Sequence, residues 1–430
     1  MENVKYPTRD QWSQLVKRPV IEASNLNALV EEIFEDIRSL GDQAVIKYNL
    51  KFDGCRVADI RVSTSDIAAA GRLVSEELKR AIQVAKLNIE KFHQQQREPV
   101  AKIETMRGVT CWRESRPIER VGIYIPGGSA PLFSTVLMLG VPAVLAGCKE
   151  IILCTPPNAD GEIPPVILYT ADLLGIDTVF RVGGIQAIGA MALGTESVSK
   201  ADKIFGPGNQ FVTAAKTVAQ QYGVSIDMPA GPSEVLVIAD STARPDFVAA
   251  DLLAQAEHGP DSQVMLVTES EDLADLVITE IQEQLKNLPR AEVIRQSLNH
   301  SKVIILEDLK SCVDFSNSYA PEHLILAVDR PSELLPSISN AGSVFVGHYS
   351  CESAGDYASG TNHSLPTNGF AKSYSGVSLD SFLKKITFQE VNEDGIRLLG
   401  PVVELMAQAE NLYAHKNSVT IRIKSLQNEY

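Results

Sequence analysis

Residues 234–267 read EVLVIADSTARPDFVAADLLAQAEHGPDSQVMLV, and this stretch decides the fold. It begins with the apolar run EVLVIA and ends with a second one, SQVMLV. Between these two runs, Pro245 marks the start of a predicted helix in which apolar residues recur at helical spacing. A buried strand, a helix and a second buried strand are the building block of parallel sheets that are covered on both faces. The stretch therefore predicts an α/β protein.

The same alternation extends to both sides of this stretch. Short apolar segments punctuated by Gly and Pro alternate with helical stretches from Val121 onward. The expected strands are VGIYI (121–125), IILC (151–154), TVFRV (178–182), EVLVIA (234–239), SQVMLV (262–267), KVIIL (302–306), HLILAV (323–328) and SVFVG (343–347). These are more strands than one small sheet needs. The turn-rich segment DMPAGPSE (227–234) is the expected crossing point between two α/β units.

The two ends of the chain differ from this middle part. An apolar face predicts a helix from Leu26 that ends at Gly41, and a longer amphipathic run extends from Ser65 to Phe92. From about Leu379 the chain has the pattern of a small appendage of mixed strand and helix. We therefore expect two parallel-sheet α/β domains, an N-terminal helical segment and a small C-terminal α+β extension.

The composition excludes several classes of protein. Of the 430 residues, 44% are hydrophobic and 22% are charged, which argues against disordered, collagen-like and coiled-coil chains. The 54 acidic and 39 basic residues give a net charge of −15, which repels nucleic acid and suits a small cationic or polar substrate. No apolar run approaches the roughly 18 residues of a membrane helix.

The cysteines and the N-terminus bear on the compartment. Six cysteines without a Cys-x-x-Cys pair favour neither a disulfide framework nor a thiolate zinc site. The first residues, MENVKYPTRDQW, lack the basic and apolar regions of a secretory signal. We therefore expect a cytoplasmic protein.

Two motifs combine His with a second polar side chain. In QAEHGPDS, Gln255 and His258 lie three positions apart, share a helix face, and can together bind a zinc-type ion. In APEHL, Glu322 and His323 precede an apolar strand and supply two proton acceptors of different pKa. Each pair, taken alone, is also typical of a solvent-exposed surface.

Two further segments carry candidate residues. SAGDYASGTNHSLPT contains Asp356 and His363 among small residues that let the backbone approach a ligand, and a carboxylate here could complete a metal site. AENLYAHKNS contains Glu410 and His415 beyond an amphipathic helix. Ordinary Asx or Ser turns and a solvated helix end are the alternative interpretations.

Two Gly-rich segments bear on nucleotide binding. YIPGGSAPLFS and FGPGNQFVT each follow an apolar strand, so their backbone N–H groups could approach phosphates. Neither matches the Gly-x-Gly-x-x-Gly fingerprint, and VGGIQAIG (182–189) does not match it either. On motif alone, a dinucleotide site is only weakly indicated.

Eight strings together resemble the histidinol dehydrogenase family. They are VGIYIPGG, QAIGAMALGT, FGPGNQFV, PAGPSE, LLAQAEHGPDSQ, YAPEHL, SAGDYASGTNH and AHKN, and they extend over most of the chain. The resemblance implies oxidation of L-histidinol to L-histidine at the end of histidine biosynthesis, by two successive hydride transfers to NAD through a bound aldehyde. It also implies one Zn²⁺ per chain and a homodimer with a swapped C-terminal part.

The resemblance also assigns roles to residues. The implied zinc ligands are Gln255, His258, Asp356 and His415, and the implied proton-transfer pair is Glu322 and His323. The same four ligands are also implied substrate contacts, together with Ser233, His323 and Glu410. His363 corresponds to a further candidate substrate contact. The implied NAD contacts are Tyr124, Gln186 and Asn209.

The implied domains are incomplete Rossmann-like units. A substrate and metal domain comprises residues 1–120 with 236–378, an NAD-binding domain residues 121–235, and a dimer-swapped extension residues 379–430. Three other functions stay open at this point: a related dehydrogenase of another small alcohol, a zinc hydrolase in which Glu322 activates water, and a non-catalytic metal-binding module.

Overall fold

The computed structural model describes residues 1–18, 26–55, 57, 59–127, 131–229 and 231–427. The chain forms two compact units. The first comprises Met1–Gln95 with Ile118–Phe382, and the second comprises Gln96–Pro117 with Leu383–Tyr430. Two parallel sheets lie in the first unit and a small antiparallel sheet in the second, so the predicted α/β class is confirmed.

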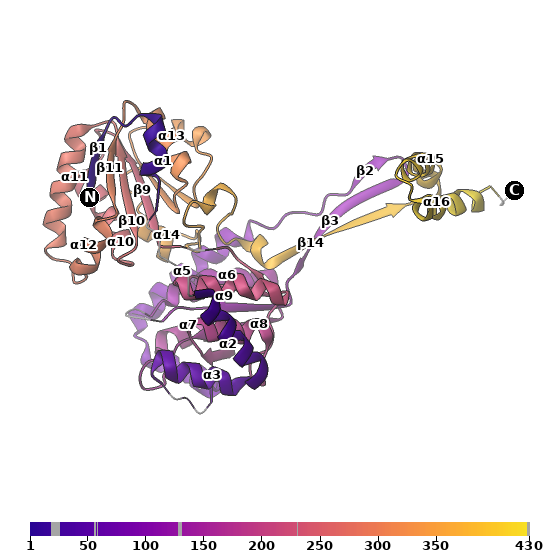
Figure 1. Ribbon diagram of the computed structural model, residues 1–430, viewed down its shortest axis with the longest axis horizontal. Helices are drawn as coiled ribbons and strands as arrows, with labels where there is room; N and C mark the ends of the chain where they lie inside the picture. Colours follow the sequence, from indigo (N-terminus) through magenta and orange to yellow (C-terminus); the bar gives the residue numbers. More distant parts are fainter. Residues whose placement is uncertain (19–25, 56, 58, 128–130, 230, 428–430) are drawn as a thin grey trace. The chain divides into compact units, whose positions relative to one another are not determined.

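The larger sheet has six parallel strands in the order β1-β11-β10-β9-β12-β13 (Figure 1). The strands are β1 (Glu2–Lys5), β9 (Glu234–Ala239), β10 (Gln263–Thr268), β11 (Lys302–Ile305), β12 (His323–Ala327) and β13 (Ser343–Val346). Every residue of β9, β10 and β12 is buried, as expected of apolar strands covered on both faces. The covering helices are α10 (Pro245–Ala256), α11 (Glu271–Leu285) and α12 (Ala291–Leu298) on one face, with α1 (Arg9–Leu15) and α13 (Leu309–Tyr319) on the other.

The second sheet of this unit has five parallel strands in the order β6-β5-β4-β7-β8. The strands are β4 (Arg120–Tyr124), β5 (Glu150–Thr155), β6 (Thr178–Arg181), β7 (Lys203–Phe205) and β8 (Ser225–Ile226). Helices α6 (Phe133–Ala146) and α7 (Pro165–Leu173) pack on one face, and α8 (Gly184–Leu193) and α9 (Gln210–Ala219) on the other. All eight strands expected from the sequence are present. Strands β7 and β8 are not among the expected strands, because they are too short to give a periodic apolar pattern.

The N-terminal helices pack against the helices of the five-stranded sheet. Helices α2 (Leu26–Leu40) and α3 (Asp42–Tyr48) contact α8, and α4 (Thr64–Ala70) and α5 (Glu76–Gln94) contact α7 and α6 respectively. The boundaries expected from the sequence group these helices with the other sheet instead. Helical spacing reveals an apolar face but not the surface that covers it. The run expected from Ser65 to Phe92 is two helices, because Ser75 caps a new start for α5.

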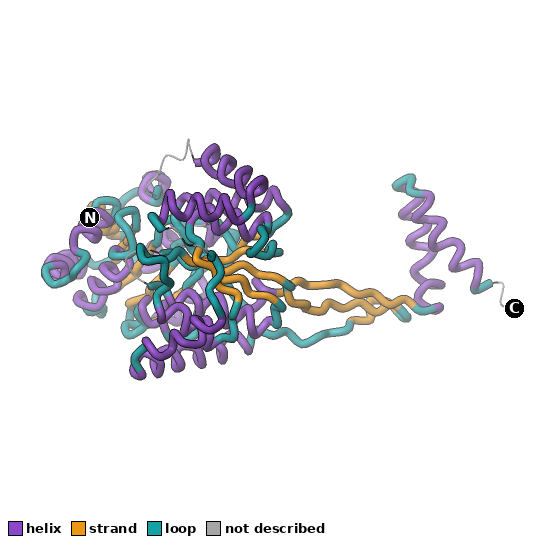
Figure 2. The backbone as a smooth tube through the Cα atoms, turned by 90° about the horizontal axis from the view of Figure 1, so that it is seen from below, coloured by secondary structure: helices purple, strands orange, loops and turns teal. Residues whose placement is uncertain are grey.

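The second unit is a β-ribbon that continues into two helices (Figure 2). Its antiparallel strands are β2 (Ile103–Met106), β3 (Val109–Pro117) and β14 (Leu383–Val391), with β3 in the middle. The helices are α15 (Glu393–Ala409) and α16 (Tyr413–Ser425), which pack against each other. The C-terminal extension expected from residue 379 thus pairs with a segment far away in the sequence.

Some of the predicted site residues of the first unit lie at or just beyond the ends of strands. His323 is the first residue of β12, at the amino end of its strand. Tyr124 is the last residue of β4, and Gln186 and Asn209 follow β6 and β7, at the carboxyl ends where open α/β sheets usually bind ligands. Across the described ranges, no helix combines the length and apolar character needed to cross a bilayer.

Candidate active site

A cavity of about 1110 Å³ in the first unit contains most of the residues predicted for metal, substrate and proton transfer. The predicted residues in its wall are Ser233, Gln255, His258, Glu322, His323, Asp356 and His363. They come from the segment before β9, the end of α10, the start of β12, and α14 (Glu352–Tyr357) with the loop after it. The order of strands in the sheet therefore brings together residues that lie up to 130 positions apart in the sequence, from Ser233 to His363.

Three donor groups in this cavity have the spacing of a metal site. One donor atom each of His258, Glu352 and Asp356 lies within 4.8 Å of the others. Gln255 reaches the same cluster. In the orientation that satisfies both ends of its amide, the nitrogen donates to Glu352 and the oxygen accepts from the Glu234 main-chain N–H at 2.9 Å. A cation favours the opposite orientation, with the amide oxygen toward Glu352, because oxygen is the electron-donating end of an amide.

Glu352 is not among the residues predicted from the sequence. Its side chain is only 1% exposed, and burial raises its pKa well above the usual value. Glu352 lies four positions before Asp356, so both carboxylates share one face of α14. This spacing in ESAGDY is the signal that could have identified it. Exposed helices commonly carry the same spacing, and the sequence does not show burial.

Two buried atoms of the cluster make no hydrogen bond within the described part of the chain. They are Nε2 of His323 and Oδ1 of Asp356, which face each other at 3.4 Å. Leaving a buried polar atom unsatisfied costs about 1–3 kcal/mol, so such atoms indicate a place where a ligand or ion completes the site. Imidazole, carboxylate and amide oxygen donors at this spacing fit a zinc-type ion.

The main chain of Glu234 holds both members of the predicted proton-transfer pair. Its N–H donates to Oε2 of Glu322 at 2.9 Å, and its carbonyl oxygen lies 3.2 Å from Nδ1 of His323. A carbonyl oxygen only accepts, so Nδ1 carries a hydrogen, and Nε2 is the nitrogen that is left without one whenever the ring is neutral. Nε2 is the atom that faces Asp356.

Carboxylates dominate the electrostatics around His323. Although burial opposes a charged imidazolium, the charges of Glu352, Glu322 and Asp356 raise the pKa of His323 to about 10. Burial raises the pKa of Glu322 to about 8. Positive charge bound nearby would lower both pKa values, because it favours the deprotonated forms. A metal in this cluster would therefore keep a larger fraction of both groups deprotonated, and so able to accept a proton, at neutral pH.

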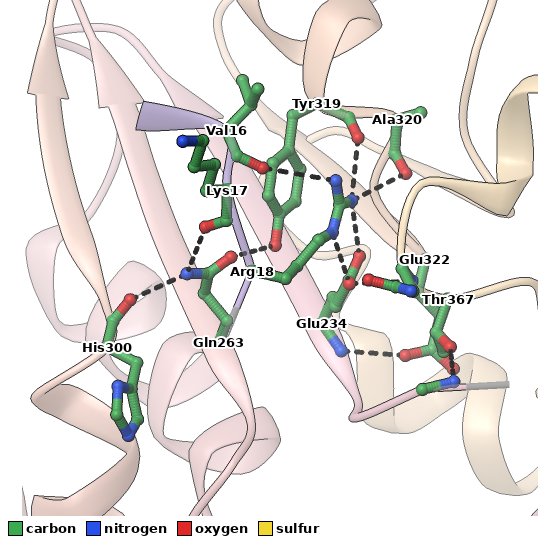
Figure 3. A network of polar contacts seen from close by, with 12 residues as sticks. Val16, Lys17, Arg18, Glu234, Gln263, His300, Tyr319, Ala320, Glu322 and Thr367 are labelled. Atoms are coloured by element: carbon green, nitrogen blue, oxygen red, sulfur yellow. Dashed lines mark hydrogen bonds and ion pairs between the residues drawn. The ribbon is translucent and has the colours of Figure 1, made fainter. Parts of the chain in front are cut away.

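The side chain of Glu234 is held in turn by Arg18 (Figure 3). The guanidinium donates to both carboxylate oxygens of Glu234, at 2.7 and 2.9 Å, and to the carbonyl oxygen of Tyr319 at 2.8 Å. It also lies 3.9 Å from the centroid of the Tyr319 ring. The side chains of Arg18 and Glu234 are only 12% and 1% exposed. The sequence gives no indication of this pair, since its members lie in separate segments.

Removing Arg18 alone should strongly destabilise the protein. Arg18→Met leaves the buried Glu234 carboxylate without its countercharge, which costs about 3–5 kcal/mol of unfolding free energy. The double variant with Glu234→Gln should regain part of this loss, because no buried charge remains. The matched control is Arg9→Met, whose ion pair with Asp314 lies at the surface and should contribute at most about 1 kcal/mol. Denaturant unfolding of the four proteins measures this, and equal losses for Arg18→Met and Arg9→Met would contradict it.

The other predicted substrate contacts lie in two different units. His363 lies 3.2 Å from the hydroxyl of Thr135 through its Nε2, and burial lowers its pKa to about 4, so its ring is neutral. Ser233 directly precedes β9. Glu410 is the C-cap of α15 and His415 lies in the first turn of α16, so both belong to the second unit and are described only within it.

The three predicted NAD contacts line a second cavity, of about 540 Å³. The hydroxyl of Tyr124 accepts a hydrogen bond from the N–H of Gly184, the first residue of α8, at 3.1 Å. Asn209 caps the start of α9 through its side chain. The amino ends of two helices therefore open on the cavity that Gln186 also lines. Such ends favour phosphate groups.

Comparison with known proteins identifies the family. The family model described as histidinol dehydrogenase matches residues 16–423. The histidinol dehydrogenases of Bacteroides thetaiotaomicron and Escherichia coli K12 are 55% and 53% identical, cover 99% and 98% of this chain, and are covered over 100% and 97% of their own lengths. The crystal structure of histidinol dehydrogenase from Elizabethkingia anophelis is 60% identical, with a TM-score of 0.98 over 100% of this chain and 99% of that one. The chain therefore belongs to the histidinol dehydrogenase family.

Proposed function

We propose that this protein oxidises L-histidinol to L-histidine in two NAD-dependent steps, through histidinaldehyde, as the last step of histidine biosynthesis. Family membership makes it an oxidoreductase of histidine biosynthesis and supports zinc and NAD as its cofactors. The observation that carries the proposal is the buried Nε2 of His323, which faces the metal-type donor cluster without a hydrogen-bond partner in the described residues. A base at a metal cluster is what alcohol oxidation requires.

Gln255, His258, Asp356 and His415 are the proposed zinc ligands. The ion would bind and orient the amino and imidazole nitrogens of the substrate. Glu352 holds the amide of Gln255 in the absence of a cation and lies within the same donor spacing. We therefore add it to the cluster as a residue that orients Gln255. The proposed ligands remain the four that the resemblance implies.

The first oxidation needs a base at the alcohol oxygen. Nε2 of His323 would accept the hydroxyl proton, and NAD, when bound, would supply the acceptor for the hydride from the carbon that carries this hydroxyl. The hydrogen bond from Nδ1 to the Glu234 carbonyl keeps the ring in the tautomer that this step requires. The Asp356 carboxylate stabilises the imidazolium that results.

The second oxidation needs a water molecule as well as a hydride acceptor. Glu322 would accept a proton from water as the water oxygen adds to the aldehyde carbon, and a second NAD would supply the acceptor for the hydride of the hydrate anion that results. The Glu234 N–H fixes the Glu322 carboxylate at 2.9 Å, beside His323. Burial raises the pKa of Glu322 to about 8, so positive charge bound nearby would be needed to keep this carboxylate deprotonated and able to accept the proton at neutral pH.

The active site is proposed to be shared between two chains of a homodimer. Apolar side chains of the second unit support this, because Leu405, Met406 and Tyr413 are 72%, 61% and 61% exposed on its two helices. A small unit that cannot bury such side chains alone is suited to docking on a twofold mate. His415 and Glu410 belong to this unit and would thus be supplied by the partner chain.

The compartment proposed is the cytoplasm. All six cysteines are free thiols, and burial raises the pKa of Cys148 and Cys312 to about 12. Unpaired cysteines suit a reducing compartment.

The test of this function is NADH formation by the purified protein given histidinol and NAD, followed at 340 nm. Two molecules of NADH per histidinol, with histidine as the product, are expected. A related dehydrogenase would instead reduce NAD when given a different alcohol. A zinc hydrolase would form no NADH with any alcohol.

Removing the metal should abolish activity without unfolding the protein. We expect one zinc per chain by elemental analysis, and loss of both metal and activity after chelation, with unchanged far-UV circular dichroism, because cores of this size do not need a metal to form. His258→Ala should also lose the metal. His348→Ala is the matched control, since His348 contacts Thr242 and lies outside the donor cluster. Fully active protein without metal would contradict the proposal.

A further inference from the structure

The cavity that contains Tyr124, Gln186 and Asn209 continues toward the active-site cavity. Pro126 and Asn209 line both of them. The nicotinamide has to reach the cavity of His323, where the hydride is transferred. The adenosine half of NAD is therefore left to the part of the smaller cavity that is remote from these shared residues.

The walls of the smaller cavity suit a flat purine ring. Most of its lining is apolar, with side chains Leu29, Phe52, Pro126, Pro131, Pro156, Pro157, Pro164, Ile167, Ile185 and Phe211. Adenine binds well between such side chains, because they bury its faces without competing for its hydrogen bonds. The wall of the smaller cavity contains few polar groups, so each of them can influence which cofactor binds there.

Asp53 is the only ionisable carboxylate among the lining residues that the structure describes. It is the last residue of a π-helical turn (Asn49–Asp53), which Gly54 ends in the left-handed conformation at φ 66°. Nε2 of Gln186 donates to Oδ2 of Asp53 at 3.2 Å and to Oδ1 of Asn49 at 3.2 Å. Asn49 in turn donates to the carbonyl oxygen of Arg181 at 2.7 Å. The carboxylate is thus held in place by a buried chain of amides.

Among the residues that the structure describes, the Asp53 carboxylate has no countercharge. Within the described residues, no lysine, arginine or histidine forms an ion pair with it, and burial raises its pKa to about 6. It is therefore ionised at neutral pH. Within the described part of the chain its side-chain oxygens accept one hydrogen bond, from Gln186, which leaves further lone pairs to accept hydrogen bonds from a ligand.

We propose that Asp53 binds the ribose hydroxyls of the adenosine half of NAD and thereby excludes NADP. This rests on the proposed NAD-dependent function. A vicinal diol offers two donors, which match the two oxygens of one carboxylate. A 2′-phosphate offers no donor and places a second negative charge against an anion in a partly buried site, which is strongly unfavourable. Asp53 is thus a specificity-determining residue for the cofactor.

The test compares Asp53→Asn with the wild type. Binding of NAD and NADP, each without histidinol, is measured by titration calorimetry, and kcat/KM for both cofactors is measured with histidinol. A hydrogen bond to a charged group contributes about 1.5–3 kcal/mol, so NAD binding should weaken on the order of 10- to 100-fold. NADP binding should strengthen relative to NAD. The KM for histidinol should be unchanged, because Asp53 lines only the smaller cavity.

The matched control is Asp160→Asn. Asp160 is exposed and lies two residues from Asn158, which lines the cavity, but it is not itself a lining residue. Removing its charge tests whether any nearby carboxylate would have the same effect. Wild-type binding of NADP as tight as that of NAD, or equal cofactor preference in the wild type and in Asp53→Asn, would overturn the inference.

A second variant keeps the inference testable if Asp53→Asn does not fold. Asp53→Glu retains the charge but displaces it, so NAD should bind more weakly while NADP stays excluded. NADP binding to this variant as tight as NAD binding would also overturn the inference. Failure of the proposed function has a different signature, because the wild type would then form no NADH from histidinol at all.

Discussion

Changing Glu322 to Gln is expected to slow the oxidation of supplied histidinaldehyde on the order of 10²- to 10⁴-fold, the usual contribution of a general base. Only the aldehyde step requires activated water, so the alcohol step should be affected much less. Gln keeps an oxygen that can accept from the Glu234 N–H, which preserves the local geometry. Single-turnover measurement of NADH from histidinol and from histidinaldehyde separates the two steps.

The control for this experiment is the neighbouring residue. His323→Asn removes the base of the first step and the imidazole next to Asp356, so it should impair both oxidations. Equal loss of both steps in Glu322→Gln would contradict the assignment of water activation to Glu322. A selective loss would establish that adjacent residues divide the two half-reactions between them.

A mixture of two inactive variants, His415→Ala and Asp356→Ala, should regain roughly a quarter of wild-type activity when the chains are unfolded and refolded together. Random mixing makes about half of the dimers mixed, and one of the two sites in each mixed dimer has both residues intact. The intact site takes His415 from one chain and Asp356 from the other. Activity of the refolded mixture, compared with each variant refolded alone, measures this.

One outcome of the same experiment would contradict the shared active site. If His415 and Asp356 of one chain serve the same site, every site in the mixture lacks one of them and the mixture stays inactive. Refolded wild type gives the yield of the procedure, against which the quarter is calculated. Two variants of one chain's residues, His258→Ala with Asp356→Ala, should not complement and form the matched negative control.

Much of the fold could be predicted because the strands are continuous apolar runs. Residues 235–239 of β9 are all apolar and buried, so their pattern contains no polar position that could be confused with an exposed helix. The pairing of β14 with β3 could not be predicted. It joins residues 383–391 to residues 109–117, and both strands are partly exposed, so neither has a clean apolar pattern.

The candidate site was predictable where chemistry and local spacing coincide. The family and its reaction class followed from distinctive motifs, and the family is confirmed over nearly the full chain. Arg18, Glu234 and Glu352 could not be found in this way. Their importance comes from burial and from contacts between distant segments, and neither property can be read from residue spacing.

The main chain of Glu234 belongs both to a strand and to the active site. It is the first residue of β9, which lies between β10 and β12 in the six-stranded sheet, and it holds both Glu322 and His323. This N–H donates to the Glu322 side chain and not to a neighbouring strand, so its exchange with solvent should report loss of the active-site geometry and should begin together with exchange of the amides in the middle of β9. Heat should accordingly abolish catalysis and melt this sheet over the same temperature range, without an inactive but folded stage before it.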